Sequence, residues 1–240
     1  MPPLPRSRAL GRAPFAVGAA FAFAVVVFAA GGVFSRYVAD DYCSASVLAQ
    51  HGFLGAQEFW YLNWSGRFSF VLAIDLLNAL GARTVPLTAP LLVLAWVMVS
   101  AAAIQSLLGE RFSRQQSRDW SVLLAVVLVG ATLATSAALW EDLYWQTGAV
   151  TYLLPIILSL AFAAVVGRMY QAAQHRHLRW LSPWVLLGAV LIAFACGCSE
   201  TAMTALATAL GLGLVVTAWR TRGVERRPLL VTLSVAFVTA

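Results

Sequence analysis

Long apolar runs separated by short polar segments dominate the pattern of this 240-residue chain. A helix that spans a bilayer needs about 20 mostly apolar residues. The runs lie at about 15–34, 85–109, 120–139, 150–167, 183–198, 200–218 and 228–240. We therefore predict an all-α fold, a polytopic bundle of transmembrane helices over residues 15–240. The last run is too short to span, so we expect this chain to be the N-terminal part of a longer protein.

The composition supports this class. The chain is 61% hydrophobic and 11% charged, with a mean hydropathy of +0.80, whereas soluble domains are about 25% charged. The net charge of +6 does not indicate a nucleic-acid partner, because the basic residues stand between apolar runs rather than on one face with exposed aromatics. We expect the lipid bilayer as the main partner. Three cysteines are too few for a disulfide framework.

Arginine positions predict the topology, because cytoplasmic loops carry the excess of basic residues. All sixteen basic residues are Arg, and residues 1–14 form a predicted cytoplasmic basic tail. We expect Gly66–Gly81 to be an interfacial helix rather than a span. With that choice only Arg36, Arg67 and Arg83 fall outside. The other thirteen fall inside: Arg6, Arg8, Arg12, Arg111, Arg114, Arg118, Arg168, Arg176, Arg179, Arg220, Arg222, Arg226 and Arg227.

The long connection at 35–84 is the first outer loop of this topology. Connections in helical bundles usually have 2–8 residues, so a loop of about fifty residues is expected to carry function or helices of its own. We predict short helical pieces at Ser44–Gln50 and Ala56–Asn63, with breaks at Gly52 and Gly55. The interfacial helix follows them.

Acidic residues sort in the opposite sense to the arginines. Orientation depends on Lys and Arg and scarcely on acids, so an outer excess of carboxylates needs another cause. One polar site on the outer face would supply it. Seven of the ten acids fall on that side: Asp40, Asp41, Glu58, Asp75, Glu141, Asp142 and Glu200.

Asp40 and Asp41 are adjacent at the head of the outer loop. Two neighbouring carboxylates can divide a reaction, one acting as an ionised base and the other holding a metal or a substrate. The alternative is an acidic cap, because a carboxylate near a helix N-terminus contributes about 0.3–1 kcal/mol. Both interpretations remain open at this point.

The segment WEDLYWQTGAVTYLLP, Trp140–Pro155, mixes aromatic and polar side chains. Aromatic rings alone would form an ordinary anchoring belt at the membrane surface. The carboxylates and amides between them also suit a sugar, whose C–H face stacks on rings while its hydroxyls form hydrogen bonds. The residues expected to contact such a sugar are Glu141, Asp142, Trp145, Gln146 and Tyr152.

Arg67 and Glu200 are two further candidates. Arg67 follows Trp64 in NWSGRFS, and its guanidinium suits a lipid phosphate, although it could instead be a snorkelling anchor. Glu200 lies in CGCSET, where two apolar runs meet. An ionisable residue at that depth usually faces a polar cavity, unless it belongs to a helix start capped by Ser199. We find no glycine-rich nucleotide loop.

Four stretches, ADDY, NWSGRFS, YWQTGAVTYLLP and GCSE, together resemble an uncharacterised bacterial family of polytopic membrane proteins related to the GT-C glycosyltransferases. The similarity runs from about Ala39 to Glu200. It implies a GT-C-like fold in the bacterial inner membrane, with the N-terminus in the cytoplasm and the active site facing outward. It also implies a polyprenyl-phosphate-linked sugar as donor, an envelope glycan, lipid or protein as acceptor, and Asp40 or Asp41 as the catalytic carboxylate.

The mechanism that follows is a single displacement, with Arg67 stabilising the phosphate that leaves. Glu141, Asp142, Gln146 and Glu200 would bind sugar hydroxyls or, with Asp40 and Asp41, hold a divalent cation such as Mg or Mn. The sequence does not choose between these two roles. The rival function is a transporter or flippase for a lipid-linked substrate, in which the same residues line a binding vestibule. Transporters tend to carry internal repeats, and no repeat is found in this sequence.

Overall fold

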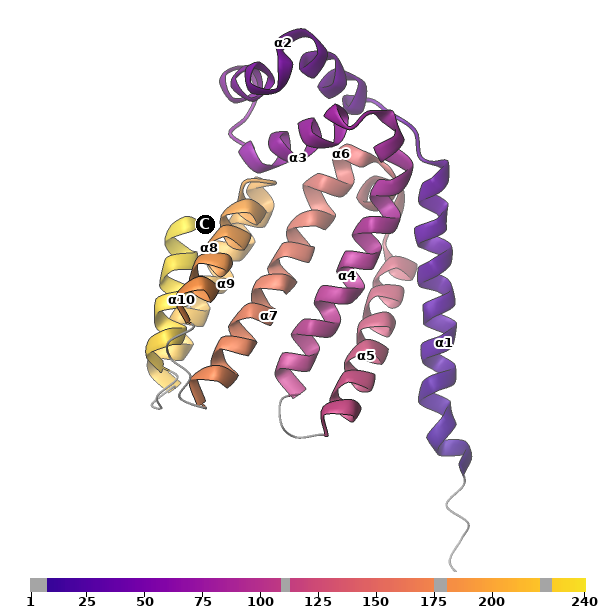
Figure 1. Cartoon of the computed structure of the whole chain (residues 1–240), viewed down its shortest axis with the longest axis vertical. Coiled ribbons are helices and arrows are strands. Elements are labelled where there is room, and N and C mark those ends of the chain that lie inside the picture. Colours follow the sequence, from indigo (N-terminus) through magenta and orange to yellow (C-terminus); the bar gives the residue numbers. More distant parts are fainter. Residues whose placement is uncertain (1–7, 109–112, 175–180, 221–225) are drawn as a thin grey trace, which may run out of the picture.

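The structure is a computed structural model that describes residues 8–108, 113–174, 181–220 and 226–240. Within these residues the protein is all-helical and contains no strand. The bundle consists of helices that pack side by side (Figure 1). They are α1 (Arg8–Gly31), α4 (Val85–Leu108), α5 (Arg114–Thr135), α7 (Leu154–Gln174), α8 (Leu181–Cys196), α9 (Glu200–Arg220) and α10 (Arg226–Thr239).

Helices long and apolar enough to cross a membrane account for most of the bundle. Five occur in the described residues: Pro14–Phe34, Ala82–Leu108, Arg114–Thr135, Gln146–Gln174 and Glu200–Arg220. Two further bundle helices have shorter apolar stretches, Pro183–Cys196 and Leu229–Thr239. This architecture is that of a multi-pass membrane protein, and it confirms the all-helical prediction.

Two groups of helices share the bundle. In the first, α1, α4, α5 and α7 pack around a core that contains Val25, Val93, Trp96, Val129 and Ile157. In the second, α8, α9 and α10 pack on each other, and α8 lies against α7 around Phe162, Ile192 and Leu210. Helix α7 belongs to both groups and joins them.

The cap, our name for α2 (Asp40–Asn63) and α3 (Phe68–Ala79), lies across one end of the bundle (Figure 1). The backbone of α2 breaks at Gly52, where φ is +67°, a value that glycine adopts without steric cost. Helix α3 lies between α2 and the bundle and buries Phe70, Val71 and Ile74 against Val150. We call the end of the bundle that α2 and α3 cover the cap end.

The segment between α5 and α7 also lies at the cap end. It consists of two π-helical turns, η4 (Trp140–Tyr144) and η5 (Ala149–Leu153), which flank the short helix α6 (Gln146–Gly148). Wide π-type turns inside helices frequently mark functional positions. The backbones of α6 and η4 are closely packed. A Cβ on Gly148, in α6, would collide with the carbonyl oxygen of Glu141, in η4.

Several bounds differ from those that the sequence predicts. Helix α2 begins at Asp40 rather than near Ser44, and Gly55 lies within a helix, so only Gly52 breaks it. The helix predicted over Gly66–Gly81 occupies Phe68–Ala79. Helix α5 ends at Thr135, before the predicted limit at Leu139, because the chain there turns into the π-helical segment.

Most of the acids of the described residues gather at the cap end of the bundle. The seven acids expected on one side all lie in the cap, in the 140–148 segment or at the first residue of α9. Arg114 and Arg118 begin α5 and Arg220 ends α9, at the opposite end (Figure 1). The acid-rich cap end is therefore where a polar site belongs.

Candidate functional site

Asp41 fastens the start of α2 to the short helix α6. Its carboxylate is buried, with 1% of the residue exposed. One oxygen, Oδ1, accepts hydrogen bonds from the Thr147 amide at 3.0 Å and from the Thr147 hydroxyl at 2.7 Å. The other, Oδ2, accepts from the Val38 amide at 3.0 Å. We call this set of three bonds the Asp41 clasp.

Residues next to Thr147 extend the same network. The Trp145 indole donates to the Val38 carbonyl at 3.2 Å. The Gln146 side-chain amide donates to the hydroxyls of Thr88 at 3.0 Å and Thr84 at 3.3 Å. Trp145 and Gln146, which the sequence assigned to sugar binding, thus make contacts inside the protein, and Gln146 is fully buried.

Asp40 differs from its neighbour because it is exposed in the first turn of α2. The residue before it, Ala39, has φ +45°, in the left-handed region that a residue with a Cβ enters only at an energetic cost. The Asp41 clasp holds the chain on both sides of Ala39. The adjacent acids therefore have separate environments, one buried and fully bonded, the other open to solvent.

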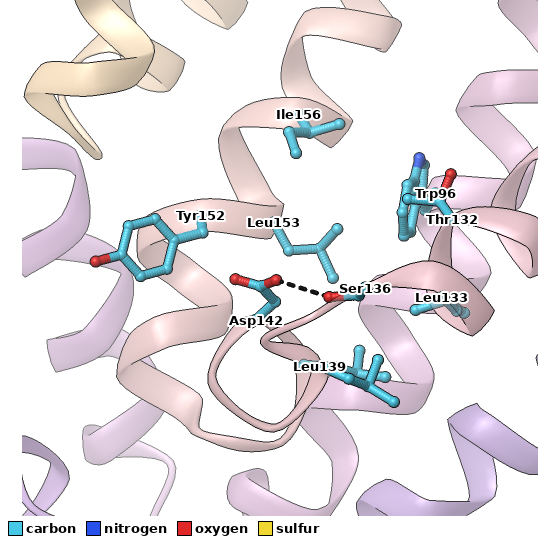
Figure 2. Close-up of a pocket in the computed structure, with 10 residues that line it drawn as sticks. Trp96, Thr132, Leu133, Ser136, Leu139, Asp142, Tyr152, Leu153 and Ile156 are labelled. Atoms are coloured by element: carbon cyan, nitrogen blue, oxygen red, sulfur yellow. Dashed lines mark hydrogen bonds between the residues drawn. The ribbon is translucent and has the colours of Figure 1, made fainter.

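A cavity of about 120 Å³ opens beside Asp142. The Asp142 carboxylate accepts a hydrogen bond from the Ser136 hydroxyl at 3.1 Å. Figure 2 shows this bond in the middle of the cavity, with the Tyr152 ring on one side and the Trp96 ring on the other. Tyr152 is 49% exposed. Of the predicted sugar contacts, Asp142 and Tyr152 thus face one common space.

A larger apolar groove of about 490 Å³ adjoins this cavity between α7 and α9. Tyr152 and Ile156 line both spaces. The far wall of the groove carries Ser199 and Thr201, on either side of Glu200. The groove therefore extends from the neighbourhood of Asp142 to the start of α9.

Arg67 and Glu200 form an ion pair between the loop before α3 and the first turn of α9. The guanidinium Nη2 and Nε lie 2.6 Å and 2.7 Å from the same carboxylate oxygen, Oε2. Trp64 stacks on the guanidinium carbon at 5.5 Å from the ring centroid. A cavity of about 200 Å³ adjoins the pair. The sequence-predicted residues Trp64, Arg67 and Glu200 are thus brought together.

The peptide of Gly197 positions this ion pair. Its carbonyl accepts from the amides of Ser69 and Phe70 at 3.1 Å and 3.2 Å. A Cβ on Gly197 would collide with the side chains of Ser69 and Phe68, so the close contact between the α8–α9 turn and α3 requires glycine here. The remaining candidate, Glu141, is exposed on the π-helical turn.

Asp75, on α3, is an acid to which the sequence interpretation gave no role. It is 0% exposed, and its Oδ2 accepts from the Gln57 side-chain amide at 2.7 Å, while Oδ1 has no partner among the described residues. Burial raises the pKa of Asp75 to about 6, although the Gln57 bond acts to lower it. The sequence signal that could have found Asp75 is its spacing from Asn78, which places both polar side chains on one face of an apolar helix. The Asn78 side-chain oxygen accepts a hydrogen bond from the Tyr37 hydroxyl at 2.9 Å.

Eight of the ten predicted site residues fall into three groups, whereas Asp40 and Glu141 are exposed and belong to none of them. The first joins Asp41 to the 145–147 turn, the second surrounds Asp142 and Tyr152, and the third is the Arg67–Glu200 pair. Among the described residues, no three His, Cys, Asp or Glu side chains gather closely enough to bind a metal together. A cation at Asp40 or Asp41 would therefore need further ligands of another kind, such as water, hydroxyls, backbone carbonyls or a bound substrate.

Comparisons with protein-family models, with curated proteins and with solved structures find no match to this chain.

Proposed function

We propose that this protein is a membrane glycosyltransferase of GT-C type. It transfers a sugar from a polyprenyl-phosphate carrier to an acceptor on the outer face of a bacterial inner membrane. The observation that carries the proposal is the gathering of seven acids at the cap end, beside a cavity that pairs the Asp142 carboxylate with aromatic rings. Carboxylates next to aromatic faces suit a carbohydrate, and a carrier lipid would reach this end through the bilayer.

The orientation of the protein is part of the proposal. The end opposite the cap carries Arg114, Arg118 and Arg220 in the described residues, and basic residues favour the cytoplasmic side. The cap end then faces outward. A nucleotide-linked donor would not be expected there, whereas a lipid-linked donor carries its own leaving group.

In the proposed reaction, Asp40 takes the proton of the acceptor hydroxyl. The acceptor oxygen then forms a bond to the anomeric carbon of the sugar. The bond from that carbon to the phosphate oxygen breaks, and polyprenyl phosphate leaves with the electron pair. Asp40 is the more accessible carboxylate of the pair because it is exposed, whereas Asp41 is buried.

Arg67 would stabilise the charge that develops on the leaving phosphate. It precedes α3, which has 12 residues and is about 18 Å long, whereas Asp40 lies near the Tyr37–Asn78 contact toward the other end of α3. Transfer to an acceptor at Asp40 therefore requires the cap to rearrange around the donor.

The Arg67 guanidinium lies beside an open cavity and is aligned by Glu200 and by the Trp64 ring. Both bonds to Glu200 come from Nε and Nη2. The donors on Nη1 are therefore directed elsewhere and suit a phosphate oxygen. Asp142 and Tyr152 would contact the sugar hydroxyls and the sugar face.

The test uses membranes that contain the full-length protein, a radiolabelled polyprenyl-phosphate sugar and a crude envelope acceptor fraction. We expect wild type to label the acceptor and Asp40→Asn to reduce the rate at least a hundredfold, because a general base typically contributes 10²–10⁴-fold. Glu58→Gln is the matched control, since Glu58 is an exposed acid of the same helix. Equal rates for wild type and Asp40→Asn would contradict the proposed role of Asp40.

A further inference from the structure

The Asp41 carboxylate has a bonding pattern unlike that of a reacting group. Both oxygens are occupied, by three donors from Val38 and Thr147, and the residue is 1% exposed. A general base must come within hydrogen-bond reach of the proton that it accepts. An acceptor hydroxyl cannot approach Asp41 unless it displaces Thr147, whose hydroxyl bond is 2.7 Å long.

The partner of Asp41 is itself fixed to the bundle. Gln146, next to Thr147, is buried and donates to Thr84, just before α4, and to Thr88 in the first turn of α4. The Trp145 indole donates a hydrogen bond to the Val38 carbonyl, and the Val38 amide donates one to the Asp41 carboxylate. The 145–147 turn therefore links α4 to the first turn of α2, and the Asp41 clasp is the connection to α2.

The clasp also surrounds a strained residue. Ala39 has φ +45°, and such a conformation persists where surrounding contacts hold it in place. Val38 before it and Asp41 after it are both tied to the 145–147 turn. This backbone conformation sets the direction in which Asp40, the residue between Ala39 and Asp41, leaves the chain.

We propose that Asp41 is a positioning residue, which locks the first turn of α2 onto Thr147 and so holds the exposed carboxylate of Asp40 at the cap end. The part that concerns sugar transfer rests on the proposed function. The clasp itself does not depend on that function. The two adjacent acids thus have separate roles, in which Asp40 reacts and Asp41 places it.

Amide-resolved hydrogen exchange on the full-length protein in lipid nanodiscs tests the clasp without any substrate. Asp41→Asn keeps one acceptor oxygen in place of two, so the amides of Val38 and Thr147 cannot both remain bonded. We expect exchange to speed up at least tenfold at one or both of these amides. Asp40→Asn is the matched control and is expected to leave both rates unchanged.

Thr147 supplies a second, independent pair of variants. Thr147→Val removes the hydroxyl bond to Asp41 and is expected to speed exchange at Val38, whereas Thr147→Ser keeps the hydroxyl and the wild-type rate. Unchanged exchange at both amides in Asp41→Asn would overturn the clasp. These results stand even if wild type transfers no sugar, in which case the proposed function fails and the exchange data still judge the clasp.

Sugar transfer then separates positioning from catalysis. We expect Asp41→Asn to lower kcat less than Asp40→Asn and to keep the wild-type pH profile, because the reacting base, Asp40, remains. Thr147→Val is expected to show the same partial loss. If Asp41→Asn abolished transfer while exchange at Val38 and Thr147 stayed at wild-type rates, Asp41 would be the reacting group and the inference would be wrong.

Discussion

Replacing Asp75 by Asn is expected to remove a pH dependence from the packing of the cap. In the folded protein burial raises the pKa of Asp75 from its ordinary value of 3.8 to about 6. Because the folded state binds this proton more tightly than the unfolded state, protonated Asp75 favours the packed cap. The stabilisation is fully present below about pH 4 and is lost as the pH rises through about 6.

The size of the effect follows from the two pKa values. A difference of about two pKa units corresponds to about 3 kcal/mol over the whole range. Roughly half of this stabilisation, about 1.4 kcal/mol, is lost between pH 5 and pH 8. This loss raises the equilibrium constant for opening of the cap by a factor of about ten. Ionised Asp75 is unfavourable because its buried Oδ1 accepts no hydrogen bond from the described residues.

Amide exchange of α3 at pH 5 to pH 8, corrected for the intrinsic rates, measures this opening directly. We expect protection of α3 in wild type to fall about tenfold across this range and protection in Asp75→Asn to stay nearly constant. Glu58→Gln, an exposed acid of the cap, should retain the wild-type dependence. Protection that is constant in wild type, or that rises with pH, would refute the reasoning.

Three further outcomes are expected. Gly148→Ala should lower the melting temperature, with a loss of about 2 kcal/mol or more, because its Cβ collides with the Glu141 carbonyl; an unchanged melting temperature would contradict the packing. Arg67→Gln should cost less than about 1 kcal/mol of stability, since Glu200 is 57% exposed, yet weaken donor binding at least tenfold, and wild-type binding would remove Arg67 from the site. In a background without the native cysteines, Gln115→Cys should react with an impermeant maleimide only after cells are opened; labelling in intact cells would reverse the topology.

The main helices could be predicted from the sequence because each depends on a local pattern. Apolar runs of about 20 residues predicted α1, α4, α5, α7 and α9, since backbone groups in a bilayer must be satisfied within the helix. Helix α5 begins at Arg114, before the predicted run at 120, after a capping box of Ser113 and Gln116 that the apolar pattern does not show. The segments predicted to be helical within residues 35–84 lie in α2 and α3, which have different bounds from the predicted ones.

The contacts of the site could not be predicted in this way. Asp41 meets Thr147 across 106 positions, and Arg67 meets Glu200 across 133. No local pattern connects such residues, because the packing of α2 and α3 on the bundle decides which of them meet. The π-helical turns at 140–153 were also missed, since the sequence there reads as an aromatic loop followed by an apolar run.

Burial changed the interpretation of single residues. Asp40 and Asp41 are equivalent in the sequence but not in the structure, where one is exposed and the other is buried. Gln146 was predicted to face a sugar and instead bonds to Thr88. Asp142 was predicted on the same grounds and does line a cavity. Residue type and spacing could nominate these side chains, whereas the fold determined which of them face a cavity.

The most direct test of the proposed function is a single-turnover experiment with the purified full-length protein in proteoliposomes. The liposomes carry a radiolabelled polyprenyl-phosphate sugar, and an envelope acceptor fraction is added outside. We expect labelled acceptor and free polyprenyl phosphate to appear together in equal amounts, and both to disappear in Asp40→Asn. Labelled lipid that crosses the bilayer without loss of its sugar would instead identify a transporter and contradict the proposed transfer.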